Sequence, residues 1–199
     1  MNSYFSEAGT FLISVVFGFY ILMVLLRFLL QVVRADFYNP VSQFIVKLTT
    51  PVLRPLRRAI PPLGGIDTAS VTLMVVLQLV ELLLIALIIA GGAAPGTLLV
   101  LAVAKLIKLT LWIFIIAILA QAILSWVQPH AYNPATILLY QLTTPVLRPI
   151  QRRLPVFSGI DLSPLVALVV LNLLVLAVPH LVLAIPGLDP LMLQMFLLR

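Results

Sequence analysis

The stretch TTPVLRPLRR at residues 49–58 shares its first seven letters with TTPVLRPIQRR at residues 143–153, in a chain of 199 residues. A shift of 94 positions aligns more than this block, because 16 of the 30 positions between 38 and 67 then carry the same residue. Identity at that density predicts an internal duplication. Apolar runs flank the block in both copies, so each unit is expected to hold one apolar run, a basic segment and a second apolar run.

The composition predicts that the duplicated units lie in a membrane. Hydrophobic residues make up 63% of the chain and charged residues 9%, with a mean hydropathy of +1.23, whereas a soluble domain carries about 25% charged residues. The net charge of +6 comes from basic clusters beside apolar runs, which is typical of contact with lipid phosphates, and no direct nucleic-acid binding is expected. The absence of cysteine excludes thiol chemistry and disulfides.

Four apolar stretches are long enough to cross a bilayer, which takes about 20 residues. They lie at about 10–33, 69–90, 105–127 and 163–185. The expected fold class is an all-α membrane protein, a parallel duplication of a two-helix unit with a kinked amphipathic or interfacial segment in each unit. The predicted divisions are a first repeat at 1–94 with its segment at 38–66, a second repeat at 95–188 with its segment at 132–160, and a short amphipathic tail at 189–199.

Both basic segments are expected on the cytoplasmic side. Two spans return the chain to its starting side, so the units run parallel and should be related by a pseudo-twofold axis along the membrane normal. Basic residues gather in 34–66 and 128–162 and are absent from 1–10 and 91–104, which by the positive-inside rule places both termini outside the cytoplasm. The first apolar run has no basic residue before it, so it is expected to be a retained span rather than a cleaved signal peptide.

Each basic segment is expected to form a broken amphipathic helix. In the first copy, Asn39-Pro40 fits an N-cap followed by proline in the first turn, Thr50-Pro51 fits a second cap and restart, and Pro55 adds a further break. The second copy repeats these residues as Asn133, Pro134, Thr144, Pro145 and Pro149. An interfacial position with arginines at the phosphates suits such a segment, and a shallow re-entrant hairpin or a plain connecting loop are the alternatives.

The charged residues of the segments are the candidates for binding. The residues expected to contact lipid or a partner protein are Arg54, Arg57, Arg58, Arg148, Arg152 and Arg153. Asp67 and Asp161 end the two segments directly before a span, where a carboxylate interacts favourably with the positive end of the helix dipole. These aspartates are expected either to cap the span or to form an ion pair with the face of the segment that carries Arg58 or Arg152.

Polar residues inside the predicted spans form a second group of candidates, since ionisable groups in a bilayer are costly and commonly functional. The residues are Arg27, Gln78, Glu81, Gln121 and Asn172. The repeat pairs Arg27 with Gln121 and Gln78 with Asn172, whereas Glu81 has no polar counterpart. Hydrogen bonds between helices, worth about 1 kcal/mol each, are one interpretation of this group, and an ion or proton path between the units is the other.

Depth along the spans predicts partners for these groups. With a rise of about 1.5 Å per residue, Arg27 should reach Gln78, and Glu81 should be reached by Arg27 or Lys108 only at full stretch. No nucleophile–base pair, glycine-rich phosphate loop or metal-ligand spacing occurs in the sequence, so no enzyme activity, catalytic residue, metal or cofactor is predicted. His130 and His180 are expected on opposite sides of the membrane, which disfavours a haem held between them.

The repeated segments resemble a known family. The strings NP…TTPVLRPLRRAIP…GID and NP…TTPVLRPIQRRLP…GIDLSP look like the signature of the YggT family, small bacterial membrane proteins with plastid relatives, over nearly the whole chain. The first copy departs from the pattern, with Thr68-Ala69-Ser70 where the second has a Ser-Pro, so its second span should begin differently. The resemblance implies the bacterial inner (plasma) membrane and connections with osmotic stress, cell-division gene neighbourhoods and, in plastids, cytochrome assembly and nucleoid distribution.

Two functions of different classes follow as expectations. The first is a non-enzymatic organiser, scaffold or assembly factor for other membrane proteins, whose basic segments bind anionic phospholipids or a partner's juxtamembrane region. The alternative is a small ion or solute transporter or channel subunit involved in osmoadaptation. Four spans enclose little polar volume, so the alternative would require a homo-oligomer or another membrane protein as partner.

Overall fold

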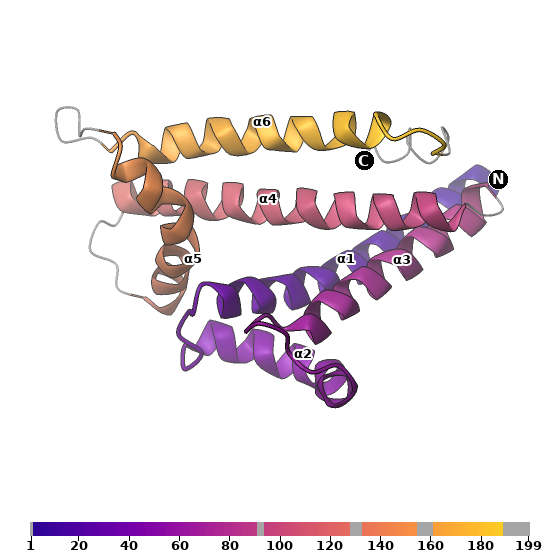
Figure 1. Cartoon of the computed structure of the whole chain (residues 1–199), viewed down its shortest axis with the longest axis horizontal. Coiled ribbons are helices and arrows are strands. Elements are labelled where there is room, and N and C mark those ends of the chain that lie inside the picture. The colour runs from indigo at the N-terminus through magenta and orange to yellow at the C-terminus, as the bar shows by residue number, and fades with distance from the viewer. Residues whose placement is uncertain (1, 91–93, 128–132, 155–160, 189–199) are drawn as a thin grey trace.

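The computed structural model describes residues 2–90, 94–127, 133–154 and 161–188, and six helices form within this part of the chain. Four of the helices are long and apolar enough to cross a membrane: α1 (Asn2–Val32), α3 (Thr68–Ala90), α4 (Pro95–Val127) and α6 (Ser163–Leu183). Two shorter helices, α2 (Pro40–Ala59) and α5 (Pro134–Gln151), connect α1 to α3 and α4 to α6 (Figure 1). The predicted all-α class and the duplicated two-span unit are confirmed.

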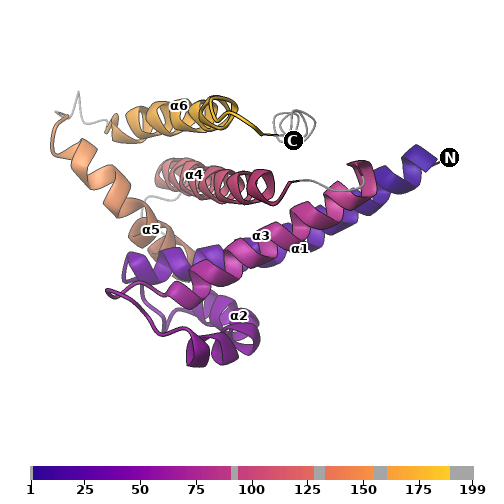
Figure 2. The same ribbon diagram turned by 45° about the vertical axis from the view of Figure 1, so that its right-hand side comes forward.

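Each unit is a pair of spans with an amphipathic helix across one end. α1 packs along α3 and α4 along α6, and the two pairs are inclined to each other, with α4 between α6 and the first pair (Figures 1 and 2). The starts of α2 and α5 meet where Nδ2 of Asn39 donates to the carbonyl of Pro134 at 2.7 Å and the backbone N–H of Asp36 donates to Oε1 of Gln141 at 3.0 Å. Both amphipathic helices therefore lie at the same end of the molecule.

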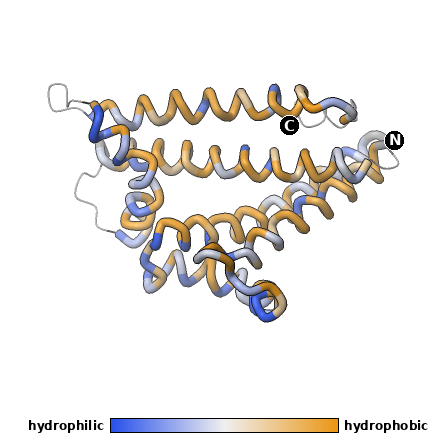
Figure 3. Tube along the Cα trace, in the orientation of Figure 1, coloured by the Kyte–Doolittle hydropathy of each residue, from blue (hydrophilic) through white to orange (hydrophobic). Residues whose placement is uncertain are grey.

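The interiors of the two units are duplicated along with their sequences. Val24 of α1 and its counterpart Ile118 of α4 are both fully buried. A second pair of counterparts, Ile21 and Ile115, is almost fully buried. Hydrophobic residues follow all four spans, whereas the hydrophilic ones gather on α2, α5 and the connections (Figure 3). The units contact each other unequally, because α4 packs on α3 while α1 and α6 make no comparable contact among the described residues. The contact between the two units therefore does not follow the predicted pseudo-twofold axis, which would pair α1 with α6 as α4 pairs with α3.

Two span boundaries differ from the predicted ones. The third span begins at Pro95, well before the predicted start at 105, because proline suits the first turn of a helix and the N–H of Leu98 already donates to the carbonyl of Ala94 at 3.1 Å. The first span likewise begins at Asn2 rather than near 10. Two predictions fall wholly or partly outside the described residues: the second basic segment at 132 and 155–160, and the tail at 189–199.

The predicted break at Thr50-Pro51 is wrong, because α2 continues through both Pro51 and Pro55. Each proline removes one donor, which leaves the carbonyls of Lys47 and Pro51 without their helical partners. Positions 47, 51 and 55 all lie on the exposed face of α2, so the freed carbonyls are not buried and the helix need not end. The second unit repeats this arrangement, since α5 continues through Pro145 and Pro149.

The predicted starts of the two amphipathic helices are confirmed. The side-chain oxygen of Asn39 accepts a hydrogen bond from the backbone N–H of Val41 at 2.9 Å. Asn133 accepts from the backbone N–H of Thr136 at 2.9 Å, and the Thr136 hydroxyl accepts in return from the N–H of Asn133. Proline follows the cap in both helices, where its missing N–H costs no helical bond.

Candidate functional site

α2 and α5 each have one face packed on the spans and one exposed basic face. The six predicted arginines are all exposed: Arg54, Arg57, Arg58, Arg148, Arg152 and Arg153. The opposite face of α2 is buried through Ser42, Ile45, Thr49 and Leu53, at the three- and four-residue spacing of one helical face. Arg57 is held by an ion pair with Asp67, so the other five residues, Arg54, Arg58, Arg148, Arg152 and Arg153, are called the basic face below.

Arg27 ties α1 to α2, instead of reaching towards Gln78 as predicted. Its Nη1 donates to the hydroxyl of Thr49 at 2.8 Å, the hydroxyl of Thr50 at 3.0 Å and the carbonyl of Val46 at 3.3 Å. The Arg27 side chain is 7% exposed. A buried guanidinium is costly unless its donors are satisfied, so these bonds fix the position of α2 on α1.

The second unit contains a neutral version of the same contact. Gln121 takes the place of Arg27, and the hydroxyl of Thr143 donates to its Oε1. Thr49 and Thr143 are both fully buried. The Thr49 hydroxyl donates to the carbonyl of Ile45, and the Thr143 hydroxyl shares its single proton between Oε1 of Gln121 and the carbonyl of Leu139. The Thr-Thr-Pro retained in both copies thus has a structural reason, because its first threonine is where the first span of each unit holds the amphipathic helix.

Asp67 and Asp161 hold the far ends of α2 and α5. Nη2 of Arg57 donates to Oδ2 of Asp67, and Nε2 of Gln151 donates to Oδ2 of Asp161 at 2.8 Å. The predicted ion pair is therefore made by Arg57 instead of Arg58, and in the second unit the neutral Gln151 contacts Asp161 instead of Arg152.

The physical reason is helical spacing. Positions 57 and 151 follow the buried Leu53 and Leu147 by four residues, and residues four apart share a helix face. Arg57 and Gln151 therefore lie beside the buried face and reach the aspartates, although both are partly exposed to solvent. The two units again use a charged contact in one case and a neutral one in the other.

The same aspartates also bond to the starts of the next spans. Oδ1 of Asp67 accepts from the N–H of Ser70 at 3.4 Å, and Oδ1 of Asp161 accepts from the N–H of Ser163 at 2.8 Å. Burial raises the pKa of Asp67, but hydrogen bonds from Arg57 and Ser70 outweigh it and hold the pKa below its ordinary value. For Asp161, burial is likewise outweighed by the bonds from Ser163 and Gln151, and its pKa is lowered. Asp67 thus bonds both to the start of α3 and to the end of α2, and Asp161, which precedes the N-cap Leu162, bonds both to the start of α6 and to the end of α5.

An ion pair between a buried carboxylate and a half-buried lysine joins the two units within the spans. Nζ of Lys105 donates to Oε1 of Glu81 at 2.7 Å, and Nε2 of Gln78 donates to Oε2 of the same carboxylate at 2.5 Å. Glu81 is 2% exposed and Gln78 is 3% exposed. Lys105 thus forms the ion pair that was predicted for Lys108 or Arg27, because α4 begins at Pro95 and places Lys105 inside the span.

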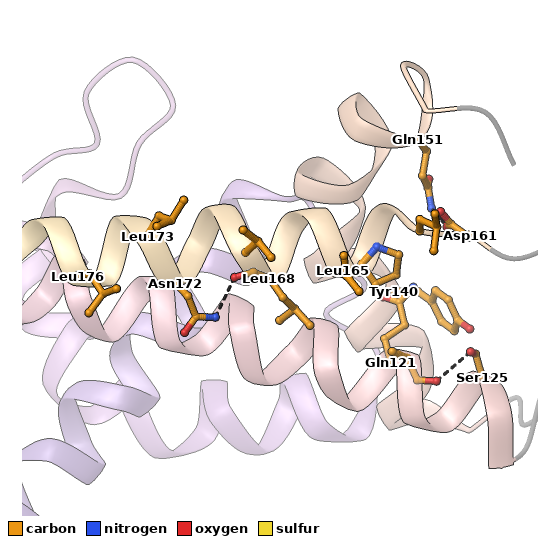
Figure 4. Close-up of a pocket in the computed structure, with 14 residues that line it drawn as sticks. Gln121, Ser125, Tyr140, Gln151, Asp161, Leu165, Leu168, Asn172, Leu173 and Leu176 are labelled. Atoms are coloured by element: carbon orange, nitrogen blue, oxygen red, sulfur yellow. Dashed lines mark hydrogen bonds between the residues drawn. The ribbon is translucent and has the colours of Figure 1, made fainter. Parts of the chain in front are cut away.

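The second unit leaves the corresponding surface open. Asn172, the counterpart of Gln78, is exposed, and its Nδ2 donates to the carbonyl of Leu168 in its own helix at 2.8 Å. Asn172 lines a groove of about 1080 Å³ together with Gln121 of α4 and Tyr140 of α5 (Figure 4). This groove, called the α6 groove below, is bounded by α4, α5 and α6.

The remaining candidates for ligand binding are few. Within the described ranges, no group of three or more His, Asp or Glu side chains could hold a metal ion. Nδ1 of His180 lies 2.8 Å from the carbonyl of Leu176 in its own helix. His130 lies outside the described residues, so the predicted separation of the two histidines is untested.

The fold is that of a small multi-pass membrane protein built by duplication. It has four apolar spans in two matching pairs, and each pair holds an amphipathic helix through side-chain hydrogen bonds. The sequence profile of CCB3/YggT matches the chain twice, at residues 6–88 and 100–182. The chain belongs to the CCB3/YggT family in a two-repeat form, as its motifs predicted.

Several bacterial proteins are similar over most of their length. The chain is 43% identical over 194 residues to protein PA0392 of Pseudomonas aeruginosa, which covers 96% of this chain and 98% of the relative. It is 39% identical over 163 residues to the YggT protein of Escherichia coli strain K12, with 81% of this chain and 84% of the relative covered. A Vibrio alginolyticus protein from the proC 3′ region is 45% identical over 159 residues, covering 79% and 85%. No solved structure matches the chain at a significant level.

Proposed function

We propose that the protein is a non-enzymatic organiser or assembly factor of the bacterial inner membrane, with both termini outside the cytoplasm and the basic face inside. The observation that supports this function is the double anchoring of α2 and α5. Each is held near its middle by a threonine, Thr49 or Thr143, and at its far end by an aspartate, Asp67 or Asp161. A loop whose charges served only to set membrane orientation would not need such anchors.

The basic face suits anionic phospholipid headgroups and acidic juxtamembrane segments of other membrane proteins. Guanidinium groups bind phosphates and carboxylates with bidentate geometry, and each basic residue near an anionic leaflet contributes about 1 kcal/mol. Pre-organised helices lose little conformational entropy when they bind. Exposed apolar side chains such as Phe44 and Val52 on α2 would enter the acyl boundary beside the arginines, which favours the interfacial position over the re-entrant one.

Neutralising the basic face while keeping the anchors tests this function. The test variant replaces Arg54, Arg58, Arg148, Arg152 and Arg153 by glutamine. Arg57 stays, because its ion pair with Asp67 holds α2 in place. Crosslinking in native membranes, followed by purification, is expected to recover fewer partner proteins and less anionic phospholipid than with the natural sequence.

Two controls make the result interpretable. The exposed residue Arg34 lies between α1 and α2, outside the basic face, and Arg34→Gln should leave recovery unchanged. Orientation is checked by the accessibility of an introduced cysteine, because removing basic residues can invert a membrane protein. Unchanged recovery from correctly oriented test protein would exclude the proposed role.

A second candidate, an ion or solute transporter or channel subunit in osmoadaptation, is favoured by the polar cluster of Gln78, Glu81 and Lys105 between α3 and α4. Ionisable groups at such depth mark ion or proton paths in many membrane proteins. The pairing of Glu81 with Lys105 instead favours a structural role, so this candidate ranks second. Ion flux through reconstituted vesicles that is unaltered by Glu81→Gln would remove it.

A further inference from the structure

The two units differ in which surfaces they bury. On α3, Gln78 and Leu82 face α4 and are 3% and 9% exposed. The residues 94 positions later, Asn172 and Leu176, line the α6 groove, where Leu176 is 62% exposed. The surface that receives a helix in the first unit is thus uncovered in the second.

The helix that covers the first unit also has an uncovered counterpart. On α4, Leu98 packs in one cluster with Leu82, and Ile113 packs in another with residues of α1, α2 and α3, so the two are 6% and 8% exposed. Their counterparts on α1 are Tyr4 and Phe19, which are 69% and 53% exposed. The chain therefore leaves two surfaces uncovered. The surface of α1 corresponds to the α4 side of the internal α3–α4 contact, and the α6 groove corresponds to the α3 side.

We propose that α1 of a second copy of this chain docks in the α6 groove, as α4 docks on α3 within each copy. The contact is head to tail, because the two partners contribute different surfaces, and it forms a ring if the rotation between copies closes. The groove extends to Gln121, Gln151 and Asp161, which anchor α5, but docking does not use the basic face, so it can be tested separately from the proposed organising function.

The chemistry of the groove favours a protein helix over lipid as its occupant. Asn172 exposes a carboxamide along a span, and polar side chains in spans face other helices or water rather than acyl chains. Hydrogen bonds of such groups to a neighbouring helix contribute about 1 kcal/mol.

Side-chain size also matches the groove. Tyr4, Phe11 and Phe19 of α1 stand where α4 has Leu98, Lys105 and Ile113, so the aromatic surface is bulkier than its internal counterpart. A bulkier helix face suits a groove that measures about 1080 Å³ when uncovered. All three aromatic side chains are more than half exposed in a single copy.

Disulfide trapping tests the proposal directly, because the natural chain has no cysteine. Ile113 and Met74 share one cluster inside the chain, and their counterparts are Phe19 and Leu168. Two differently tagged variants, Phe19→Cys and Leu168→Cys, are expressed together and oxidised in native membranes. A disulfide-linked dimer that carries both tags is the expected product.

The matched control replaces Leu168→Cys by Val170→Cys, since Val170 is an exposed α6 residue that does not line the groove. The dimer yield with Leu168→Cys is expected to exceed the control several-fold, and equal yields would overturn the proposal as random collision. A double variant, Phe19→Cys/Leu168→Cys, should give linked oligomers. Crosslinking only within single chains would assign the groove to the chain's own α1. If no crosslink forms and Leu168→Cys reacts readily with a lipid-soluble maleimide, the groove is occupied by lipid. Either result overturns docking of a second copy.

Discussion

Arg27 and Gln121 occupy the same place in the two units, yet only one of them is charged. Both contact the buried first threonine of the repeated Thr-Thr-Pro. Since a neutral amide holds α5 in the second unit, hydrogen bonding rather than charge is what fixes each amphipathic helix to its span. The arginine adds contacts to Thr50 and Val46 that the glutamine contact does not duplicate.

Replacing Arg27 separates these two contributions. Because a hydrogen bond between helices in a membrane contributes about 1 kcal/mol, Arg27→Gln is expected to lower the free energy of unfolding by about 1 kcal/mol and Arg27→Met by about 2 kcal/mol. Thermal unfolding of the purified protein in mild detergent measures both values. An Arg27→Gln variant as unstable as Arg27→Met would show that the charge itself is required.

The contact between Asp67 and Arg57 should make stability depend on acid. The pKa of Asp67 is lowered in the folded protein, so its contribution is present above the ordinary aspartate value of about 4 and is lost as the pH falls from there through the folded pKa. The melting temperature of the natural protein should therefore fall more steeply below about pH 4 than that of Asp67→Asn. Parallel curves for the two proteins would contradict the role given to this carboxylate.

At the scale of the element, α2 is a helix fastened at two points rather than a rigid rod. Its middle is held through Thr49 by Arg27 and its end through Arg57 by Asp67. Its remaining contact with the spans is a narrow buried face. Loss of one anchor should loosen α2 locally, and loss of both should release it from α1.

Labelling of a buried cysteine measures this release. Leu53→Cys serves as the reporter, since Leu53 is fully buried between α2 and the spans. In a Thr49→Val/Asp67→Asn background it should react several-fold faster with a water-soluble maleimide. The control is Leu147→Cys at the equivalent buried position of α5, which should stay protected in the same background. Equal acceleration at both positions would indicate general unfolding instead.

The sequence indicated the amphipathic helices well but not how they are held. Asn39 and Asn133 correctly marked their starts, because an N-cap depends on local chemistry alone. Continuity through Pro51 and Pro55 was missed, since the effect of a proline depends on whether the freed carbonyls are buried. One signal for the contact between the first span and the amphipathic helix was available in the sequence: Arg27 is replaced by Gln121 in the second unit, whereas Thr-Thr is kept in both. The role of the basic face stays a prediction.

At the scale of the whole molecule, the Glu81–Lys105 pair is the polar link between the units. Lys105→Met would leave a buried carboxylate without its cation, which is expected to lower the free energy of unfolding by about 3–5 kcal/mol. The double variant Glu81→Leu/Lys105→Met should recover most of this loss, because an apolar pair avoids the desolvation cost. Chemical unfolding in detergent measures both, and a double variant no better than Lys105→Met would contradict a purely structural role.

The repeat and the hydropathy sufficed to predict the class and the four spans, and the resemblance of the repeated motifs to those of YggT proteins predicted the family. The unequal contact between the units could not be predicted, because two units of the same pattern can be joined in several ways. The predicted span at 105–127 left Lys105 at its edge, which is wrong for a related reason. The depth of Lys105 follows from the start of α4 at Pro95, and its partner follows from how α4 crosses α3. Both depend on packing between units, on which the identical motifs carry no information.

The position of Lys105 also matters while the chain is being made. Glu81 leaves the ribosome 24 residues ahead of the lysine that neutralises it, so α3 reaches the translocon carrying an uncompensated carboxylate. On insertion scales an acidic residue at the centre of a span costs about 3 kcal/mol. We expect α3 to wait beside the translocon until α4 emerges, and the two helices to enter the lipid together as a hairpin. The ion pair would then determine when α3 and α4 enter the lipid as well as how the two units contact each other.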